Sequence, residues 1–300
     1  MIRTERLLKR LDGQKVLENL NLTVKRGSIY GLIGSNGAGK STLLNVLAGV
    51  YKPDGGTAKI CGEDIFENVG VKGKTAYISD DPFYFNGATV DEMASYLNSV
   101  YKSFSMEKYK SVAGVFPINT SKRISSFSKG MRRQVSIIFA LAQQPEILLC
   151  DESFDGLDPV IRKLVKRLFV NEVAENGMTI VISSHNLREM ENLCDTIGIL
   201  HDNRIVVEKS ISDIKETLHR YQAAYKPMID IDMLKDKLDI LTSSMRGSIL
   251  ELTVRGDREK ISAVLESYAP LLIDEIELTL EDIFICEMEV SGYDFSKILL

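Results

Sequence analysis

Nine consecutive residues constrain the fold of this chain more than any others: Gly34-Ser35-Asn36-Gly37-Ala38-Gly39-Lys40-Ser41-Thr42. They match the P-loop pattern G-x-x-x-x-G-K-[ST], in which a glycine-rich backbone turns its N–H groups inward around a phosphate. An apolar run at 28–33 predicts a buried strand before the loop, and apolar residues at helical spacing predict a helix from Ser41 to Gly49. This context favours nucleotide binding, with Lys40 reaching the β- and γ-phosphates and Ser41 offering its hydroxyl to Mg²⁺.

Charge and hydropathy exclude some classes of function. The net charge of −5 over 300 residues gives no electrostatic case for nucleic acid. The N-terminus lacks the apolar run of a signal peptide. No stretch reaches the roughly 20 apolar residues that a membrane span needs, since the nearest, 135–150, is interrupted by polar residues at 143–146. If the protein works at a membrane, another chain must hold it there.

The cysteines are far apart and show no metal-ligand spacing: Cys61, Cys150, Cys194 and Cys286. Cys61 and Cys150 are in or beside apolar runs that resemble strands, so we expect reduced core residues of a cytosolic protein.

The order of elements predicts an α/β domain over residues 1–208. Alternating residues near the N-terminus predict a small antiparallel sheet beside a P-loop core. Later apolar runs predict buried strands, and a helical insert at about 88–144 separates two parts of the sheet. The predicted strands lie at 75–79, 146–152 and 179–184, followed by a hairpin at 197–207.

After about residue 209 the pattern changes to short, mixed elements. A linking helix is predicted at 211–218, strands at 238–241, 249–254 and 271–276, and helices at 258–268 and 280–284. These elements predict a small C-terminal α+β accessory domain over 209–300, without a visible catalytic cluster.

Two acids end the apolar run at 146–152. Such a run is typical of a buried parallel strand that delivers Asp151 and Glu152 to the carboxyl edge of a sheet. Water is a poor nucleophile, so a carboxylate must orient it and accept its proton, while Mg²⁺ and Lys40 offset the phosphate charge. The sequence therefore predicts hydrolysis as well as binding.

Taken together, these elements resemble the ATP-binding cassette of ABC transporters over about residues 1–208. Five motifs in the family's order support this: Walker A at 34–42, Walker B at 147–152, a signature-like motif at 127–131, a D-loop-like turn at 155–158, and a switch histidine, His185. The resemblance implies ATP and Mg²⁺ as ligands. It further implies that Asp151 supports Mg²⁺, Glu152 polarises the attacking water and His185 contacts the γ-phosphate.

The resemblance also implies a nucleotide site completed by a second subunit. Ser128 and Gly130 survive in the signature-like motif Phe127-Ser128-Lys129-Gly130-Met131, and they would face the γ-phosphate held by that subunit. Ser128 is equally well placed as an ordinary helix cap. Asp158 belongs to the loop that would cross the subunit interface.

Two positions depart from the family's pattern. Asp80 stands where the family has a glutamine, and an acid there could still reach Mg²⁺ or water. Leu11 occupies the position of an aromatic residue that stacks on adenine. Leucine can pack on the base but has no π system, so we expect weak discrimination between bases and tolerance of GTP.

The sequence near 278–284 resembles the ending of cassettes that serve bacterial ABC-2 type exporters. That resemblance implies a cytoplasmic ATPase subunit, peripheral on the inner face of the cell membrane. It would act as a homodimer, or a heterodimer with a second cassette, on a separate transmembrane permease. The aromatic run at 82–85 could contact the permease or pack inside the insert. A non-transport ATPase acting on ribosomes or DNA is an alternative, and a regulatory cassette without turnover is a third.

Overall fold

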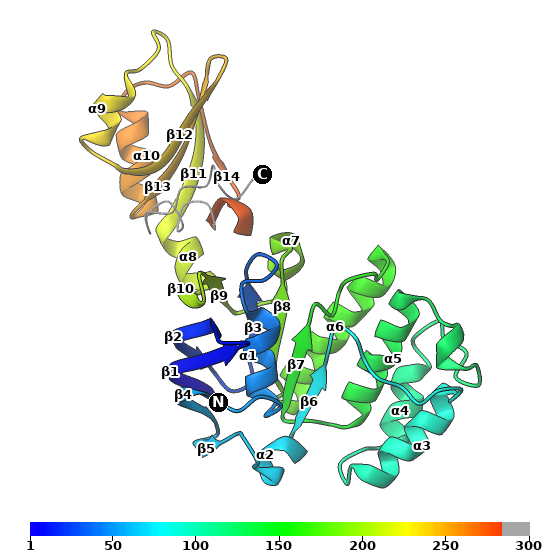
Figure 1. Cartoon of the computed structure of the whole chain (residues 1–300). Helices are drawn as coiled ribbons and strands as arrows, with labels where there is room; N and C mark the ends of the chain where they lie inside the picture. The colour runs from blue at the N-terminus through cyan, green and yellow to red at the C-terminus, as the bar shows by residue number, and fades with distance from the viewer. Residues whose placement is uncertain (284–300) are drawn as a thin grey trace. The chain divides into compact units, whose positions relative to one another are not determined.

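The computed structural model describes residues 1–283, and the chain divides into two compact units between Glu208 and Lys209 (Figure 1).

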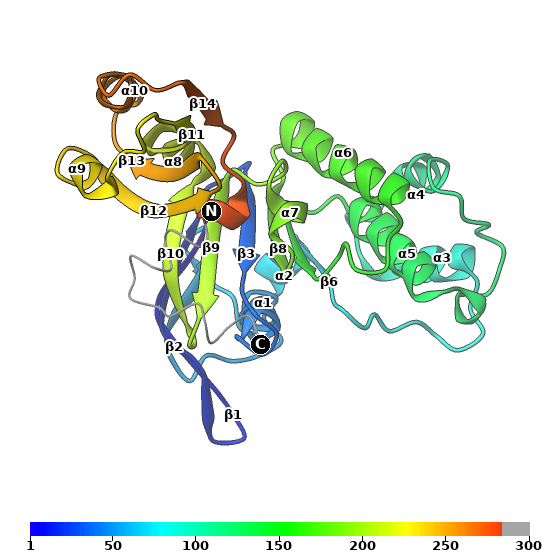
Figure 2. The same cartoon turned by 90° about the horizontal axis from the view of Figure 1, so that it is seen from above.

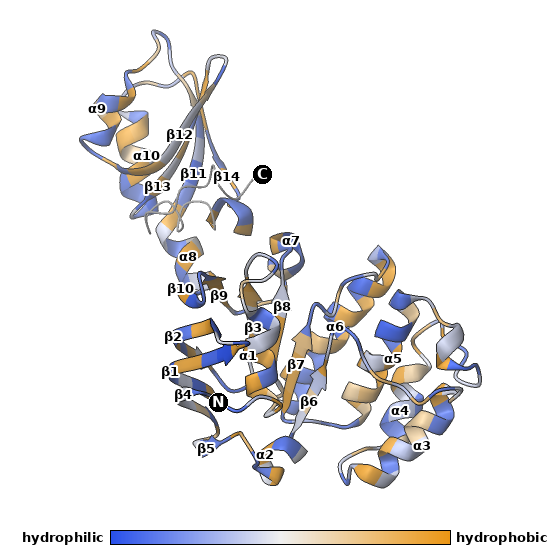
Figure 3. Ribbon diagram, viewed as in Figure 1, coloured by the Kyte–Doolittle hydropathy of each residue, from blue (hydrophilic) through white to orange (hydrophobic). Residues whose placement is uncertain are grey.

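The first unit is built on a six-stranded sheet in the order β10-β9-β3-β8-β7-β6. Strand β3 is parallel to β8 and β9, and β7 is parallel to β6 and β8. Every residue of β3, β7 and β8 is buried, and β7 is hydrophobic along most of its length (Figure 3). The strands are β3 (Ile29–Ile33), β6 (Thr75–Ile78), β7 (Ile147–Asp151), β8 (Thr179–Ser184), β9 (Thr196–His201) and β10 (Arg204–Ser210).

A second sheet of the first unit has the order β2-β1-β4-β5, with antiparallel neighbours. Its inward residues, such as Ile2 and Leu20, share one hydrophobic core with Leu43 and Leu47 of helix α1. The elements are β1 (Ile2–Leu11), β2 (Gln14–Val24), α1 (Lys40–Leu47), β4 (Gly55–Ile60), β5 (Glu63–Asp64) and α2 (Val69–Gly73). The predicted P-loop NTPase core with an antiparallel subdomain is confirmed.

The predicted insert forms a helical layer next to the edge strand β6 (Figures 1 and 2). Its helices are α3 (Val90–Val100), α4 (Met106–Ala113) and α5 (Lys129–Ala142), with a 3₁₀ turn at Ile124–Ser126. A hydroxyl caps each helix: Thr89 on α3, Ser105 on α4 and Ser128 on α5. Helices α6 (Pro159–Asn176) and α7 (Leu187–Met190) complete the unit. None of the helices in residues 1–283 combines the length and hydrophobicity that a membrane span requires.

The second unit contains an antiparallel sheet in the order β12-β13-β11-β14. Its elements are α8 (Ile211–Thr217), β11 (Leu218–Ala224), α9 (Ile231–Lys235), β12 (Asp239–Arg246), β13 (Ile249–Arg255), α10 (Arg258–Glu266) and β14 (Leu272–Ile276), and residues 280–283 are helical. Phe284, in the last predicted helix, and Cys286 lie outside the described residues.

Strand β11 and helix α9 were not predicted, and the predicted linking helix extends one residue too far, into β11. Strand β11 is central, yet it carries His219, Arg220 and Gln222, which obscure an apolar pattern. Acids on other segments pair with these groups: Glu275 binds Nδ1 of His219, and Glu251 binds both Arg220 and Gln222.

The prediction that Cys61 is a core residue is wrong. Strand β4 ends at buried Ile60, and the chain then turns with a φ of +53° at Cys61, which leaves that thiol exposed. Cys150 and Cys194 are buried free thiols. Burial raises the pKa of the Cys150 thiol to about 12, so this thiol stays protonated at neutral pH.

Candidate functional site

The glycine-rich loop joins buried strand β3 to helix α1. Gly37 and Gly39 have φ values of +82° and +105°, which side-chain-bearing residues rarely adopt. A Cβ on Gly39 would also lie 2.9 Å from the carbonyl oxygen of Val16. Glycine is therefore required where the backbone curls, and the free N–H groups at the start of α1 give the loop an anion-binding character.

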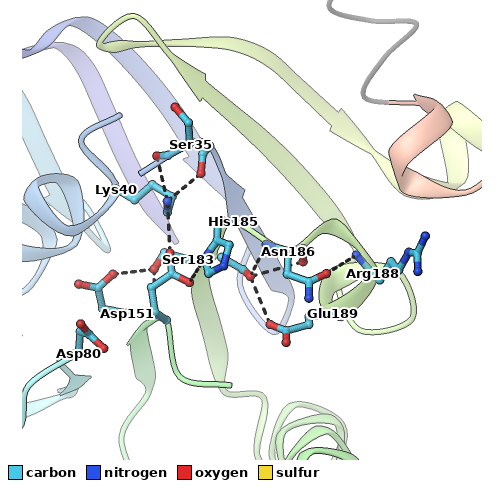
Figure 4. Close-up of polar contacts among 12 residues, drawn as sticks. Ser35, Lys40, Asp80, Asp151, Ser183, His185, Asn186, Arg188 and Glu189 are labelled. Carbon is cyan, nitrogen blue, oxygen red and sulfur yellow. Dashed lines mark hydrogen bonds and ion pairs between the residues drawn. The ribbon is translucent and has the colours of Figure 1, made fainter. Parts of the chain in front are cut away.

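Lys40 folds back over this loop. Its ammonium donates to the carbonyl oxygens of Gly34, at 2.7 Å, and Ser35, at 3.2 Å. It also lies 3.2 Å from Oε1 of Glu152, and the Lys40 side chain is only 5% exposed. Lys40 lies beside Ser35 of the loop (Figure 4), and the acid that directly follows β7 pairs with this nearly buried cation.

The carboxyl ends of two neighbouring parallel strands supply other polar groups. Asp151 ends β7, Glu152 follows it, and His185 follows β8. Nδ1 of His185 lies 3.0 Å from Oε2 of Glu152. Glu152 has a φ of +46°, a strained conformation for a residue with a side chain. That strain lies at the carboxylate that contacts both Lys40 and His185.

Ser183 joins the two acids and was not singled out from the sequence. Its hydroxyl donates to Oδ1 of Asp151 at 2.7 Å and accepts from the backbone N–H of Glu152 at 3.0 Å. Ser183 is completely buried. Burial and the nearby Asp151 carboxylate also raise the pKa of Tyr77, so its phenol remains neutral beside the acid.

Lys40, Glu152 and His185 line a cavity of about 380 Å³, whereas Asp151 and Ser183 are not among its lining residues. The lining residues from the loop and α1 are Asn36, Gly37, Gly39, Lys40, Ser41 and Thr42, and those from other segments are Val16, Asp80, Glu152, Asp155 and His185. Val16 and Asp155 were not predicted to be site residues. Leu11 is not among the lining residues; it ends β1 and pairs with Gln14 across a turn.

Asp80 reaches the cavity but is also engaged elsewhere. Its Oδ1 accepts from a guanidinium nitrogen of Arg133 at 2.7 Å and lies 3.4 Å from the ammonium of Lys129. Both cations belong to α5. The sequence carries no signal for these pairings, because 49 and 53 positions separate the partners along the chain.

Ser128, Gly130 and Asp158 do not line this cavity. Ser128 and Asp158 cap α5 and α6 by accepting from backbone N–H groups. Gly130 lies against the loop before α6: a Cβ there would be 2.2 Å from the carbonyl oxygen of Gly156. These three residues therefore form a separate part of the same unit.

The arrangement can bind a polyphosphate and activate water. The loop and Lys40 provide donors for phosphate, and Glu152 provides a carboxylate next to them. Ser41 and Asp151 carry the hard oxygen ligands that Mg²⁺ prefers. Glu152, Asp155 and His185 also come together, with potential ligand atoms within 4.8 Å of one another.

The sequence model of the family described as "ABC transporter" matches residues 17–155. The chain is 30% identical over 288 residues to the ABC transporter ATP-binding protein YtrB of Bacillus subtilis (strain 168), covering 96% of this chain and 98% of that relative. It is 34% identical over 225 residues to the bacitracin transport ATP-binding protein BcrA of Bacillus licheniformis, covering 74% of this chain and 73% of BcrA.

Solved structures of ATP-binding subunits and cassettes are also similar to this chain. An ATP-binding subunit of an ABC transporter is similar with a TM-score of 0.66 and 29% identity, covering 72% of this chain and 92% of that one. A dimeric ATP-binding cassette, bound to ADP and Pi after hydrolysis, is similar with a TM-score of 0.63 and 21% identity, covering 70% of this chain and 99% of that one. The latter likeness concerns the fold alone.

Proposed function

The chain belongs to the ABC transporter family as an ATP-binding and ATP-hydrolysing subunit, and from this premise we propose that it pairs head-to-tail with a second cassette around two ATP molecules. The second cassette is another copy of this chain or a related one. One observation supports this arrangement. Lys40, Glu152 and His185 meet at one cavity, whereas Ser128 and Gly130 do not line it. Ser128 and Gly130 would instead contact the nucleotide that the second cassette binds.

The residues of one cavity have separable tasks in this proposal. Lys40 exchanges its contacts with the loop carbonyls and Glu152 for contacts with phosphate oxygens. Glu152 orients the attacking water and takes its proton, while His185 fixes the Glu152 carboxylate. Ser41 and Asp151 would hold Mg²⁺, which would neutralise phosphate charge when bound. Ser183 keeps Asp151 and Glu152 in register.

Closure of the two cassettes would drive a separate membrane permease from its inner face, and hydrolysis would reset it. The bacitracin-transport relative supports transport, and the exporter-like ending at 278–284 supports export. A groove of about 420 Å³ between the sheet and the helical layer is a suitable permease contact. The two aromatic residues at 83 and 84 behave differently. The Tyr84 hydroxyl lies 2.6 Å from Oγ of Ser136 inside the helical layer. Phe83 lines the groove and is 80% exposed.

Changing Phe83 to aspartate is expected to release the chain from membranes of the cells that make it. A charge on an exposed anchor of this groove should weaken docking about tenfold or more, as loss of an interface hot spot does. The measurement is the share of the chain that sediments with membranes. Val69→Asp is the matched control, because Val69 is 83% exposed but does not line the groove. Equal membrane shares for wild type and Phe83→Asp would exclude this docking surface.

Base recognition gives a second test. Since Leu11 supplies no aromatic ring and only Val16 represents the β1–β2 segment in the cavity lining, ATP should outcompete GTP by less than about tenfold. Competition between the two nucleotides for the purified chain measures this ratio. A strong ATP preference in the unmodified chain would contradict the expectation.

A further inference from the structure

Asp80 has two uses that compete for one carboxylate. Its Oδ1 receives both cations of α5, Arg133 at 2.7 Å and Lys129 at 3.4 Å. The same side chain lines the phosphate cavity with Lys40 and Glu152. Asp80 therefore lies between the helical layer on one side and the nucleotide site on the other.

The two cations differ in how firmly they are fixed. Arg133 is 1% exposed, and it also donates to the backbone carbonyl oxygens of Ser79, at 2.6 Å, and Asp80, at 3.0 Å. These bonds would hold Arg133 in place without the Asp80 carboxylate. Lys129 is 66% exposed, and its longer ion pair with Asp80 is accessible to water, so its strength is small and adjustable. Lys129 is thus the partner that can leave.

Lys129 occupies a position where a side chain is tolerated. The next residue, Gly130, has no room for a Cβ because of the Gly156 carbonyl oxygen. Lys129 instead extends to Asp80. Asp80, one of the two positions named above at which this chain departs from the family's pattern, contacts Lys129.

We propose that Asp80 is a positioning residue. Its carboxylate either pairs with Lys129 or faces the Mg²⁺ that Ser41 would hold in the phosphate cavity. Lys129 then weakens the binding of Mg²⁺–ATP, and the arrival of Mg²⁺–ATP loosens the tether between Asp80 and α5. The physical reason is electrostatic: a carboxylate that already neutralises an ammonium presents less negative potential to a divalent cation. This inference rests on the proposed function, since it takes Mg²⁺–ATP as the ligand.

The test measures equilibrium affinity for a fluorescent ATP analogue, with Mg²⁺ and with EDTA, in the Glu152→Gln background, where turnover does not interfere. Lys129→Ala should tighten binding in Mg²⁺ by roughly two- to five-fold, the range of an exposed ion pair, with no tightening in EDTA. Asp80→Asn should weaken binding in Mg²⁺. In the double variant, Lys129→Ala should have no further effect, because its partner carboxylate is gone.

Lys110→Ala on α4 is the control for loss of an exposed lysine from the helical layer. The inference is overturned if Lys129→Ala changes affinity equally in Mg²⁺ and EDTA, or if its effect persists with Asp80→Asn. Either result would make the Asp80–Lys129 pair a surface contact only. If the unmodified chain, with Glu152, Asp80 and Lys129 all intact, fails to bind the analogue at all, the proposed nucleotide site itself is refuted.

Discussion

Replacing Glu152 with glutamine is expected to lower ATP turnover by at least about 100-fold, the contribution of a positioned general base, while ATP binding persists. Glutamine keeps the shape of the side chain but cannot accept a proton from water. Glu152 contacts both Lys40 and His185, at 3.2 and 3.0 Å, and no other carboxylate contact to Lys40 occurs within residues 1–283. With hydrolysis blocked, ATP should hold two chains together, so light scattering should report a dimer that forms only with ATP.

Three measurements belong to this experiment: phosphate release, equilibrium ATP binding and molar mass with and without ATP. Glu175→Gln makes the same chemical change at an exposed acid near the end of α6 and should leave all three unchanged. A Glu152→Gln chain with full turnover would refute the mechanism. Loss of ATP binding together with turnover would instead assign Glu152 a role in forming the phosphate loop, through its contact with Lys40.

Adding a single methyl group at position 130 is expected to lower ATP turnover strongly. In Gly130→Ala the new Cβ would lie 2.2 Å from the carbonyl oxygen of Gly156. No rotamer change can relieve this distance, because the neighbouring atoms all belong to the backbone. The start of α5 or the loop at Gly156 must therefore move. Displacement of a catalytic element by about 1 Å can cost up to about 100-fold in rate, so we expect turnover to fall about 10- to 100-fold.

ATP binding by a single chain should survive this change, since Gly130 does not line the cavity that contains Lys40. Measuring binding and turnover on the same preparation separates the two effects. Gly73→Ala provides the control: a Cβ at this helical glycine meets no heavy atom within 4 Å. Unchanged turnover in Gly130→Ala would mean that the two loops adjust without cost, and that the contact does not position the signature-like motif.

The elements that could be predicted from sequence are those with strong local patterns. The P-loop required its glycines, and β3, β7 and β8 are buried on both faces, so each contains a run of consecutive apolar residues. Strand ends then located the acids and His185. The elements that were missed depend on partners distant in the chain. Strand β11 is central although it carries Arg220, because Asp282 and Glu251 neutralise that side chain.

The residues of the site likewise fall into those that the local sequence predicts and those that depend on distant parts of the chain. Residue types placed Asp151 and Glu152 at one strand end, but nothing local indicated that Ser183, 32 residues after Asp151, would join them. Asp80 was identified by its position after β6, and its engagement with Arg133 depends on how α5 packs. Adenine recognition was inferred from Leu11, whereas Val16, five residues later, reaches the cavity lining.

The parallel strands β6, β7 and β8 lie side by side in the sheet, and this order has a consequence for how the protein can diversify. The central strand carries the acids, while each flanking strand contributes a different loop: Asp80 after β6 and His185 after β8. Main-chain pairing fixes the spacing of the strands independently of the loops they carry. Relatives could therefore exchange the loop after β6, and with it the response to a permease, while Asp151 and Glu152 stay where they are. One hydrolytic centre can in this way serve many transport systems.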